Sequence, residues 1–269
     1  MRGASRASYL ELREKLEAAV QSTEAAELAG DELFAVVRLL DGEPGLRRAL
    51  ADPSKPGAEK AAIIRHLLHG KVAPATEGLA ADAASARWAS PRDFTDAVEG
   101  LAIEAYVMAA QREDKLDDLE DDLFRFARVV GGQPDLRAAV TGPAPGAAKQ
   151  GLLENLIGGK VSGPSLALIT RVVTHPRGRS PQAALNVAAQ VAAQRREQLI
   201  ATVRTAVPLS EQQQERLQAS LIAAYGHGVH LNIVLDPAVI GGMSVQIGDE
   251  LIDGTAASRL AEVRRRLAS

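Results

Sequence analysis

Four of the five histidines in this sequence occur in two pairs that could contribute ligands to a metal ion. His66 and His69 are three positions apart, and so are His227 and His230, a spacing that would place each pair on one face of a helix. However, His69 directly precedes a glycine that we expect to end a helix, and the second pair spans a predicted loop-to-strand junction. Zinc sites use three or four protein ligands, and no third ligand is indicated near either pair. We therefore predict no metal site.

An acidic run from residue 113 to residue 122 also carries ligand chemistry, because carboxylates bind calcium and magnesium. Its leucines, however, keep helical spacing, and it lacks the glycine of an EF-hand loop. We interpret the run as the solvated face of a helix. An electrostatic docking face for a basic segment of a partner remains an alternative.

The motifs of enzymes are incomplete. Gly159-Lys160 is followed by Val161 rather than by serine or threonine, and Glu154 stands where a phosphate-binding loop needs its first glycine. The segment from Gly163 to Ala167 lacks the closing glycine of a nucleophile elbow. We predict no catalytic residue and no cofactor.

Composition restricts the function further. The chain has 269 residues, no cysteine, a formal net charge of −3 and a pI near 6.0. The absence of cysteine excludes disulfides and thiolate metal sites, and the charge argues against nucleic acid as a partner. The longest apolar run, 101–110, contains Glu104 and is too short to span a bilayer. We expect a soluble protein with no direct membrane insertion.

The elements that carry these residues are arranged in an internal repeat. Residues 39–50 recur as 129–140, and residues 57–72 recur as 146–161 with seven of sixteen positions identical. The offset is 90, becomes 89 through a loop rich in proline and glycine, and then returns to 90. Because loops absorb insertions and deletions, this pattern indicates a duplication.

Each copy has the apolar spacing of short helices. Ser90-Pro91 and Ser180-Pro181 each combine an N-cap residue with a first-turn proline, so each predicts the start of a long helix. Ser8 and Glu11 have the spacing of a capping box. The apolar run before each repeated Gly-Lys-Val ends in glycine, as a helix C-cap would. We predict two tandem helical bundles, at 1–95 and 96–198.

After residue 199 the apolar period changes to two. Alternation predicts a strand from Ala201 to Pro208, a second over 229–235 and a third over 243–247, with a capping box at Ser210 opening a helix between the first two. Gly248-Asp249 is typical of a hairpin turn. A last helix is expected from about Thr255. The predicted fold class is mostly α, with a small α+β domain at 199–269.

This C-terminal stretch resembles the signature of the δ subunit of F-type ATP synthases, the bacterial relatives of the mitochondrial oligomycin-sensitivity-conferring protein. The matching elements are Asp236-Pro237, Ile240-Gly241-Gly242, Ile247-Gly248-Asp249, Ile252-Asp253-Gly254 and Arg259-Leu260. Thr255 stands where serine is usual, which keeps a hydroxyl group at a helix start. The resemblance covers about residues 95–269, so the first copy would be an extra bundle.

The resemblance implies a non-catalytic stator subunit that links the catalytic head to the peripheral stalk. It implies that the bundle receives N-terminal helices of α subunits and that the final domain binds b subunits. For the α contact, the candidate residues are Leu101, Ala105, Met108, Leu166, Ile169 and Val173. For the b contact, they are Val239, Ile240, Leu260, Val263 and Leu267. Burial of both sets in the protein's own core is the competing interpretation.

The resemblance also implies a single copy in a hetero-oligomeric complex, peripheral to the cell membrane on its cytoplasmic side. A helical-repeat adaptor or regulatory protein unrelated to ATP synthase is the alternative from another class. Copurification with α and b chains would distinguish the two. An enzyme is the third possibility, and it would require a pocket that contains perturbed acid and base groups.

Overall fold

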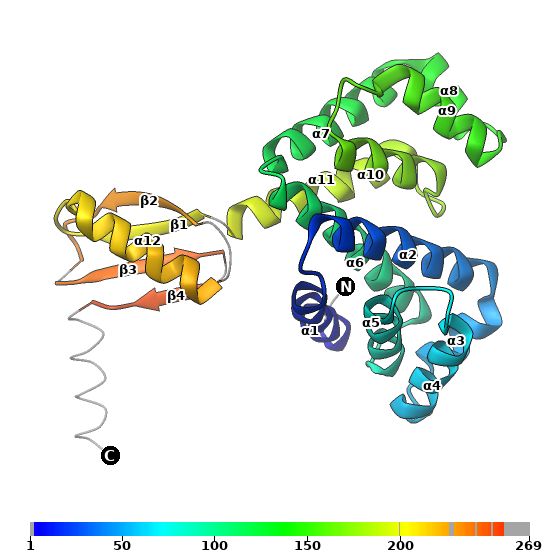
Figure 1. Ribbon diagram of the computed structural model, residues 1–269, viewed down its shortest axis with the longest axis horizontal. Coiled ribbons are helices and arrows are strands. Elements are labelled where there is room, and N and C mark those ends of the chain that lie inside the picture. The colour runs from blue at the N-terminus through cyan, green and yellow to red at the C-terminus, as the bar shows by residue number, and fades with distance from the viewer. Residues whose placement is uncertain (1–2, 199, 226–228, 240, 249, 256–269) are drawn as a thin grey trace. The chain divides into compact units, whose positions relative to one another are not determined.

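The computed structural model describes residues 3–198, 200–225, 229–239, 241–248 and 250–255. The chain divides into two compact units, Met1–Ala192 and Ala193–Ser269, and each is considered by itself. Helices dominate the described residues, with one small sheet near the C-terminus (Figure 1). The predicted fold class is therefore confirmed. No helix among these residues is both long enough and apolar enough to cross a membrane.

The helices of the first unit repeat with the offset seen in the sequence. The first five are α1 (Ala4–Ala19), α2 (Thr23–Gly42), α3 (Pro44–Ala51), α4 (Gly57–Leu68) and α5 (Pro74–Ser85). They are followed by α6 (Pro91–Arg112), α7 (Leu116–Gly132), α8 (Pro134–Thr141), α9 (Gly146–Ile157), α10 (Gly163–Thr174) and α11 (Pro181–Gln198). The starts of α3 to α6, at 44, 57, 74 and 91, return in α8 to α11 at 134, 146, 163 and 181, which are differences of 90, 89, 89 and 90.

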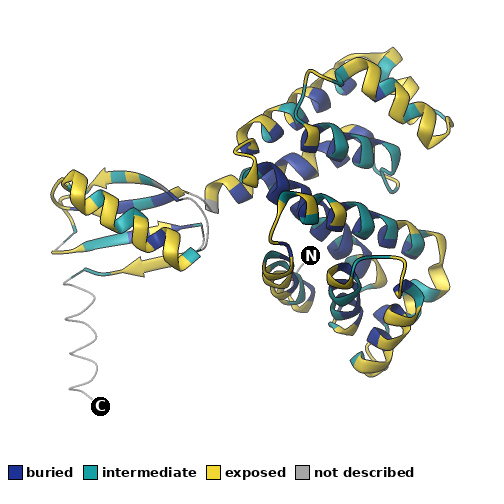
Figure 2. Ribbon diagram, in the orientation of Figure 1, coloured by how far each residue is buried: buried dark blue, intermediate teal, exposed yellow. Residues whose placement is uncertain are grey.

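Helix α6 lies where the two groups of helices meet (Figure 1). It packs against α1, α2, α3 and α5 on one side and against α7 and α10 on the other. As a result, every residue of the apolar run 101–110 is buried (Figure 2). A helix that is apolar all round is a helix buried all round. The one carboxylate in the run, that of Glu104, forms an ion pair with Arg13, with 2.9 Å between Oε1 and Nε.

Local signals set most of the helix ends. The Oγ of Ser90 accepts a hydrogen bond from the backbone of Asp93, and Ser180 caps α11 in the same way. Gly70 and Gly159, just beyond α4 and α9, both have φ of 71°, a conformation that glycine adopts without steric cost. These predictions are confirmed.

The capping box predicted at Ser8 is wrong. Helix α1 already begins at Ala4, so Ser8 lies inside it, and its Oγ donates to the backbone oxygen of Arg87 at 3.0 Å. A long-range hydrogen bond has therefore taken the hydroxyl that the sequence pattern assigned to a cap.

The second unit contains β1 (Ile200–Thr205), α12 (Glu211–Tyr225), β2 (His230–Leu235), β3 (Met243–Ile247) and β4 (Glu250–Asp253). The strand order is β2-β1-β3-β4, with β1 parallel to β2 and the other pairs antiparallel. The three predicted strands are present, although β1 ends at Thr205, before the expected Pro208. Thr205 Oγ1 donates to the backbone oxygen of Val207 at 3.1 Å, which turns the chain away from the sheet.

The core of this unit lies between the sheet and α12. Val203 pairs with Val245 and Ala201 with Ile247, so these four side chains share the face on which Leu221 packs. Ser210 and Gln213 form the predicted capping box, with reciprocal hydrogen bonds of 2.9 and 3.3 Å. Gly248 has φ of 54°, as the predicted hairpin turn requires. The predicted last helix lies outside the residues that the structure describes.

Candidate partner-binding surfaces

The residues predicted to line a groove for an α subunit helix are mostly in the core. On α6, Leu101, Ala105 and Met108 are at most 3% exposed, and on α10, Ile169 and Val173 are fully buried. Leu166 is half-buried. Packing between α6 and α10 accounts for these positions in the chain alone. Their contact with a partner helix stays a prediction.

Most of the residues predicted to contact the b subunit lie outside the part of the chain that the structure describes. Val239 is half-buried in the turn after β2. Ile240, Leu260, Val263 and Leu267 lie outside the described residues. This contact also stays a prediction.

Sequence reasoning missed an interface inside the helical unit, between α2 and the second copy. Asp31 on α2 accepts a hydrogen bond from Arg171 Nε of α10 at 2.7 Å and another from the hydroxyl of Tyr106 on α6. The rings of Phe34 and Tyr106 lie 6.3 Å apart, centroid to centroid. Burial, followed by the hydrogen bond to Asp31, raises the pKa of the Tyr106 hydroxyl, so it acts as a donor at any physiological pH.

The segment between α10 and α11 is held by an ionic network. Arg177 bonds Asp41 of α2 at 2.7 Å and, on α6, Asp96 at 2.9 Å and Glu99 at 2.6 Å. Arg179 also bonds Glu99 at 2.6 Å. Arg177 has φ of 51°, which is sterically unfavourable for a residue with a side chain. Two arginines flanking Gly178 are the only sequence signal of this network, and they do not indicate its carboxylates.

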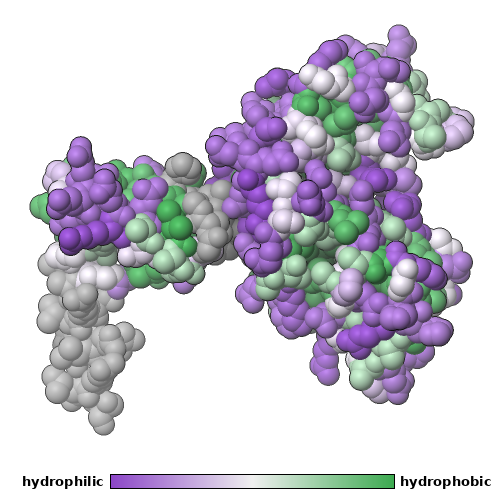
Figure 3. Space-filling view, in the orientation of Figure 1, coloured by the Kyte–Doolittle hydropathy of each residue, from purple (hydrophilic) through white to green (hydrophobic). Residues whose placement is uncertain are grey.

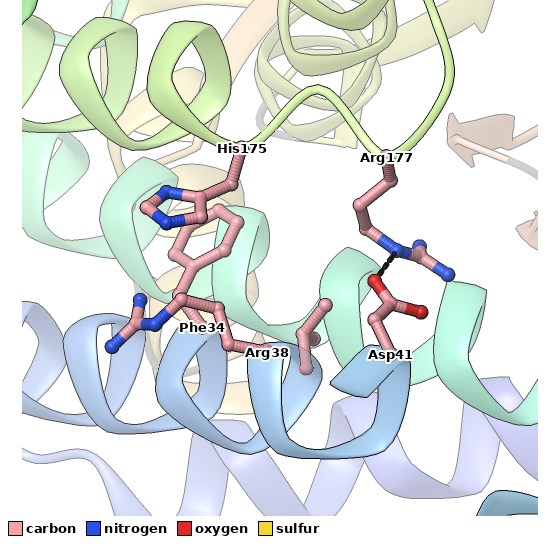
Figure 4. A pocket seen from close by; sticks show the side chains of 6 residues that line it. Phe34, Arg38, Asp41, His175 and Arg177 are labelled. Atoms are coloured by element: carbon pink, nitrogen blue, oxygen red, sulfur yellow. Dashed lines mark hydrogen bonds and ion pairs between the residues drawn. The ribbon is translucent and has the colours of Figure 1, made fainter. Parts of the chain in front are cut away.

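A pocket of about 370 Å³ lies between these contacts (Figure 4). His175 and Arg177 reach into it from the segment after α10, and Phe34, Arg38 and Asp41 reach from α2. Burial lowers the pKa of His175, and the charges of Arg38 and then Arg171 lower it further. The imidazole is thus neutral at pH 7.

The pocket has no recognisable catalytic arrangement. The residues that line it include no hydroxyl or thiol nucleophile; they are Phe34, Val37, Arg38, Asp41, His175 and Arg177. Asp41 is engaged by Arg177 rather than by the imidazole, which instead shares a hydrogen bond of 2.9 Å with the hydroxyl of Thr174. The pocket is consistent with imperfect filling between two packed copies.

Residues 116–122 of the predicted acidic run form the first turns of α7, and residues 113–115 lie in the turn that precedes it. Leu116 and Leu119 are buried, whereas Asp117, Asp118 and Asp121 are exposed. Figure 3 shows hydrophilic residues over the surface where α7 lies. The interpretation as a solvated helix face is confirmed for residues 116–122. Within the described part of the chain, no group of three or more potential ligands could hold a metal ion.

Apolar side chains are nevertheless exposed further along α7. Phe124 is 54% exposed and Val129 is 41% exposed. The guanidinium carbon of Arg128 lies 5.3 Å from the centroid of the Phe124 ring, within cation–π distance. An aromatic ring that is exposed beside charged groups is typical of a protein-binding surface.

The described residues form a repeated helical unit, in which ion pairs join the helices, and a small α+β unit, an architecture suited to a structural protein. The model of the ATP synthase delta (OSCP) subunit family matches residues 104–267, which is more than half of the chain. The chain belongs to this family, whose members are stator subunits of F-type ATP synthases.

Relatives match over the full length. The sequence is 49% identical to ATP synthase subunit delta of Thermobifida fusca over 100% of both chains, and 47% identical to that of Streptomyces griseus over 100% of both chains. The additional first copy therefore occurs in these relatives too. A chain in the mitochondrial ATP synthase hexamer of Toxoplasma gondii is 22% identical with a TM-score of 0.33, covering 63% of this chain and 97% of that one.

Proposed function

We propose that this chain links the α subunits of the catalytic head to the b subunits of the peripheral stalk, and that it does so without catalysing a reaction. The observation that carries the proposal is the family match over residues 104–267, which spans both the second helical copy and the α+β unit. The chain is a stator component of the ATP synthase complex, and its place on the cytoplasmic side of the cell membrane would follow from its partners.

We further propose three domains, 1–95, 96–198 and 199–269, with the α contact in the second and the b contact in the third. Helical bundles commonly bind an amphipathic partner helix along an apolar groove. The second copy is the one covered by the family match, which supports its assignment to the α subunits. Half-buried Leu166 is the one predicted groove residue that is accessible without rearrangement.

A stator has to remain bound and stiff while the rotor exerts torque on the head. Slow dissociation then matters more than any titrating group, and affinity differences between related complexes arise mostly in the dissociation rate. The buried α6 and the network around Arg177 support this role, because both join helices that are far apart in sequence.

The test compares ATP synthase from cells with and without this chain. Without it, we expect ATP hydrolysis to continue in detached heads while proton pumping in membrane vesicles is lost, and we expect purified chain to restore pumping. A complex that assembles and stays coupled without the chain would refute the proposal.

A second assay tests the partners. Immobilised chain should retain a peptide of the α subunit N-terminus and the soluble part of b, and removal of residues 199–269 should abolish only b binding. Retention of neither partner would favour the alternative of an unrelated helical-repeat adaptor.

A further inference from the structure

The outer face of α7 repeats a face of α2 that is occupied within the chain. Asp31, Phe34 and Arg38 of α2 recur 90 residues later as Asp121, Phe124 and Arg128 of α7. Leu33 and Gly42 recur as well, in Leu123 and Gly132. The two helices therefore present the same acidic, aromatic and basic groups at the same spacing.

On α2 part of this face is covered by the second copy, although Arg38 is exposed. Phe34 is only 4% exposed, and Asp31 is bonded by Arg171 of α10. The occupants of the α2 face are thus Arg171, near the C-terminal end of α10, which bonds the aspartate, and the ring of Tyr106 on α6, which lies 6.3 Å from that of Phe34.

Among the described residues, the corresponding side chains of α7 have no such cover. Phe124 is 54% exposed, compared with 4% for Phe34. Asp121, with its side chain 73% exposed, bonds Arg125 of its own helix at 3.3 Å. Such an exposed pair, four residues apart, contributes little stability and is readily exchanged for another partner.

We propose that the face formed by Asp121, Phe124 and Arg128 is a docking site for a basic amphipathic helix of another subunit. The α2 face supplies the template: an arginine or lysine of the partner bonds Asp121, as Arg171 bonds Asp31, and an aromatic or apolar side chain of the partner covers Phe124, as Tyr106 lies against Phe34. The exposed carboxylates of Asp117 and Asp118 next to it extend the negative charge toward the basic end of the partner.

The repeat-equivalent helix end in a second copy of this chain, at the end of α5, does not fit the site. With the offset of 89, the position of Arg171 in the first copy is Asp82, and that of His175 is Ala86. Asp82 would face Asp121 with a like charge, and it is already paired with Lys15 at 3.1 Å. The occupant is therefore a different chain.

The inference rests on the proposed function in one respect, namely that the partner is sought in purified ATP synthase. The experiment introduces the photo-cross-linker p-benzoylphenylalanine in place of Phe124 in the full chain. The matched control carries it in place of Leu28 of α2, which is 49% exposed. We expect position 124 to give at least about fivefold more cross-linked product than position 28, and mass spectrometry to find a helical segment with an arginine or lysine.

A second change then tests the charge. Asp121→Lys in the cross-linking chain should lower the yield about fivefold, because it places like charges at a surface contact. Equal yields at positions 124 and 28, a product with another copy of this chain, a segment without basic residues, or no effect of Asp121→Lys would each overturn the inference. Absence of the chain from the purified complex would instead refute the proposed function.

Discussion

Replacement of Arg177 tests how the two helical copies are joined. Its side chain is 11% exposed and meets three carboxylates, those of Asp41, Asp96 and Glu99. The backbone at this position has φ of 51°, where any residue except glycine is strained by about 1–2 kcal/mol. Side chain and backbone therefore have opposite effects on stability, and two substitutions separate them.

Arg177→Ala keeps the strain and removes the guanidinium group. Breaking a buried ion pair costs about 3–5 kcal/mol when its partner is left alone. Here Arg179 still bonds Glu99, and Arg47 still bonds Asp41 at 3.2 Å, so we expect the free energy of unfolding to fall by about 2–3 kcal/mol. Arg177→Gly also loses the ion pairs but relieves the strain, so it should be more stable than the alanine variant by about 1 kcal/mol.

The measurement is urea unfolding of the full chain, followed by fluorescence. Trp88 is the single tryptophan and is buried in the helical unit, where its Nε1 donates to the backbone oxygen of Ala83. Its emission therefore reports on this unit. Arg125→Ala, at an exposed position on α7, is the control and should change stability by less than about 0.5 kcal/mol. An alanine variant as stable as the parent chain, or a glycine variant less stable than the alanine variant, would refute the reasoning.

Three further predictions concern the same unit. Gly30→Ala should lower stability by about 1–3 kcal/mol in the same urea assay, because the added Cβ would lie 2.7 Å from the ring of Tyr106; an unchanged midpoint would contradict the close approach of the helices. Asp31→Asn should cost about 1–2 kcal/mol, whereas the repeat-related Asp121→Asn should be neutral within about 0.5 kcal/mol, and equal effects would argue against a stabilising contact of Asp31 with Arg171 and Tyr106. Burial lowers the pKa of His175 below its unfolded value of about 6.5, so the unfolded chain binds a proton more readily than the folded chain. The stability due to neutral His175 is therefore complete above pH about 6.5 and is lost as the pH falls through the folded pKa. Unfolding measured from pH 7.5 to 5 should show a smaller decline for His175→Gln, and identical declines would exclude this contribution.

Local sequence signals predicted the elements that depend on local chemistry. The N-caps at Ser90 and Ser180, the capping box at Ser210 and the strands of the second unit follow from side chains within a few residues of each other. The repeat offset also located corresponding helices in the two copies. Predicting these features does not require knowing which helices and strands contact one another.

Features that depend on distant partners could not be predicted in this way. Alanines and leucines around α6 showed that it is apolar, but not that both copies cover it, and so candidate groove residues such as Ala105 and Met108 lie in the core. Ser8 bonds the backbone of Arg87, which is 79 residues away in the sequence, and Arg177 bonds Asp41, which is 136 residues away. Periodicity identifies an apolar face, whereas the identity of its neighbour is a property of the tertiary structure.

The position of α6 has a consequence for how the duplicated protein bears force. In the repeat it is both the sixth helix of one copy and the first of the next, so the copies share a member instead of being joined by a linker. A flexible linker would let one copy move relative to the other, and part of the rotor's torque would then bend the linker instead of reaching the stalk. With a common helix, neither copy can unfold without exposing the apolar side chains of the other. Duplication has in this way added a second helical copy to the stator subunit without adding a linker between the copies.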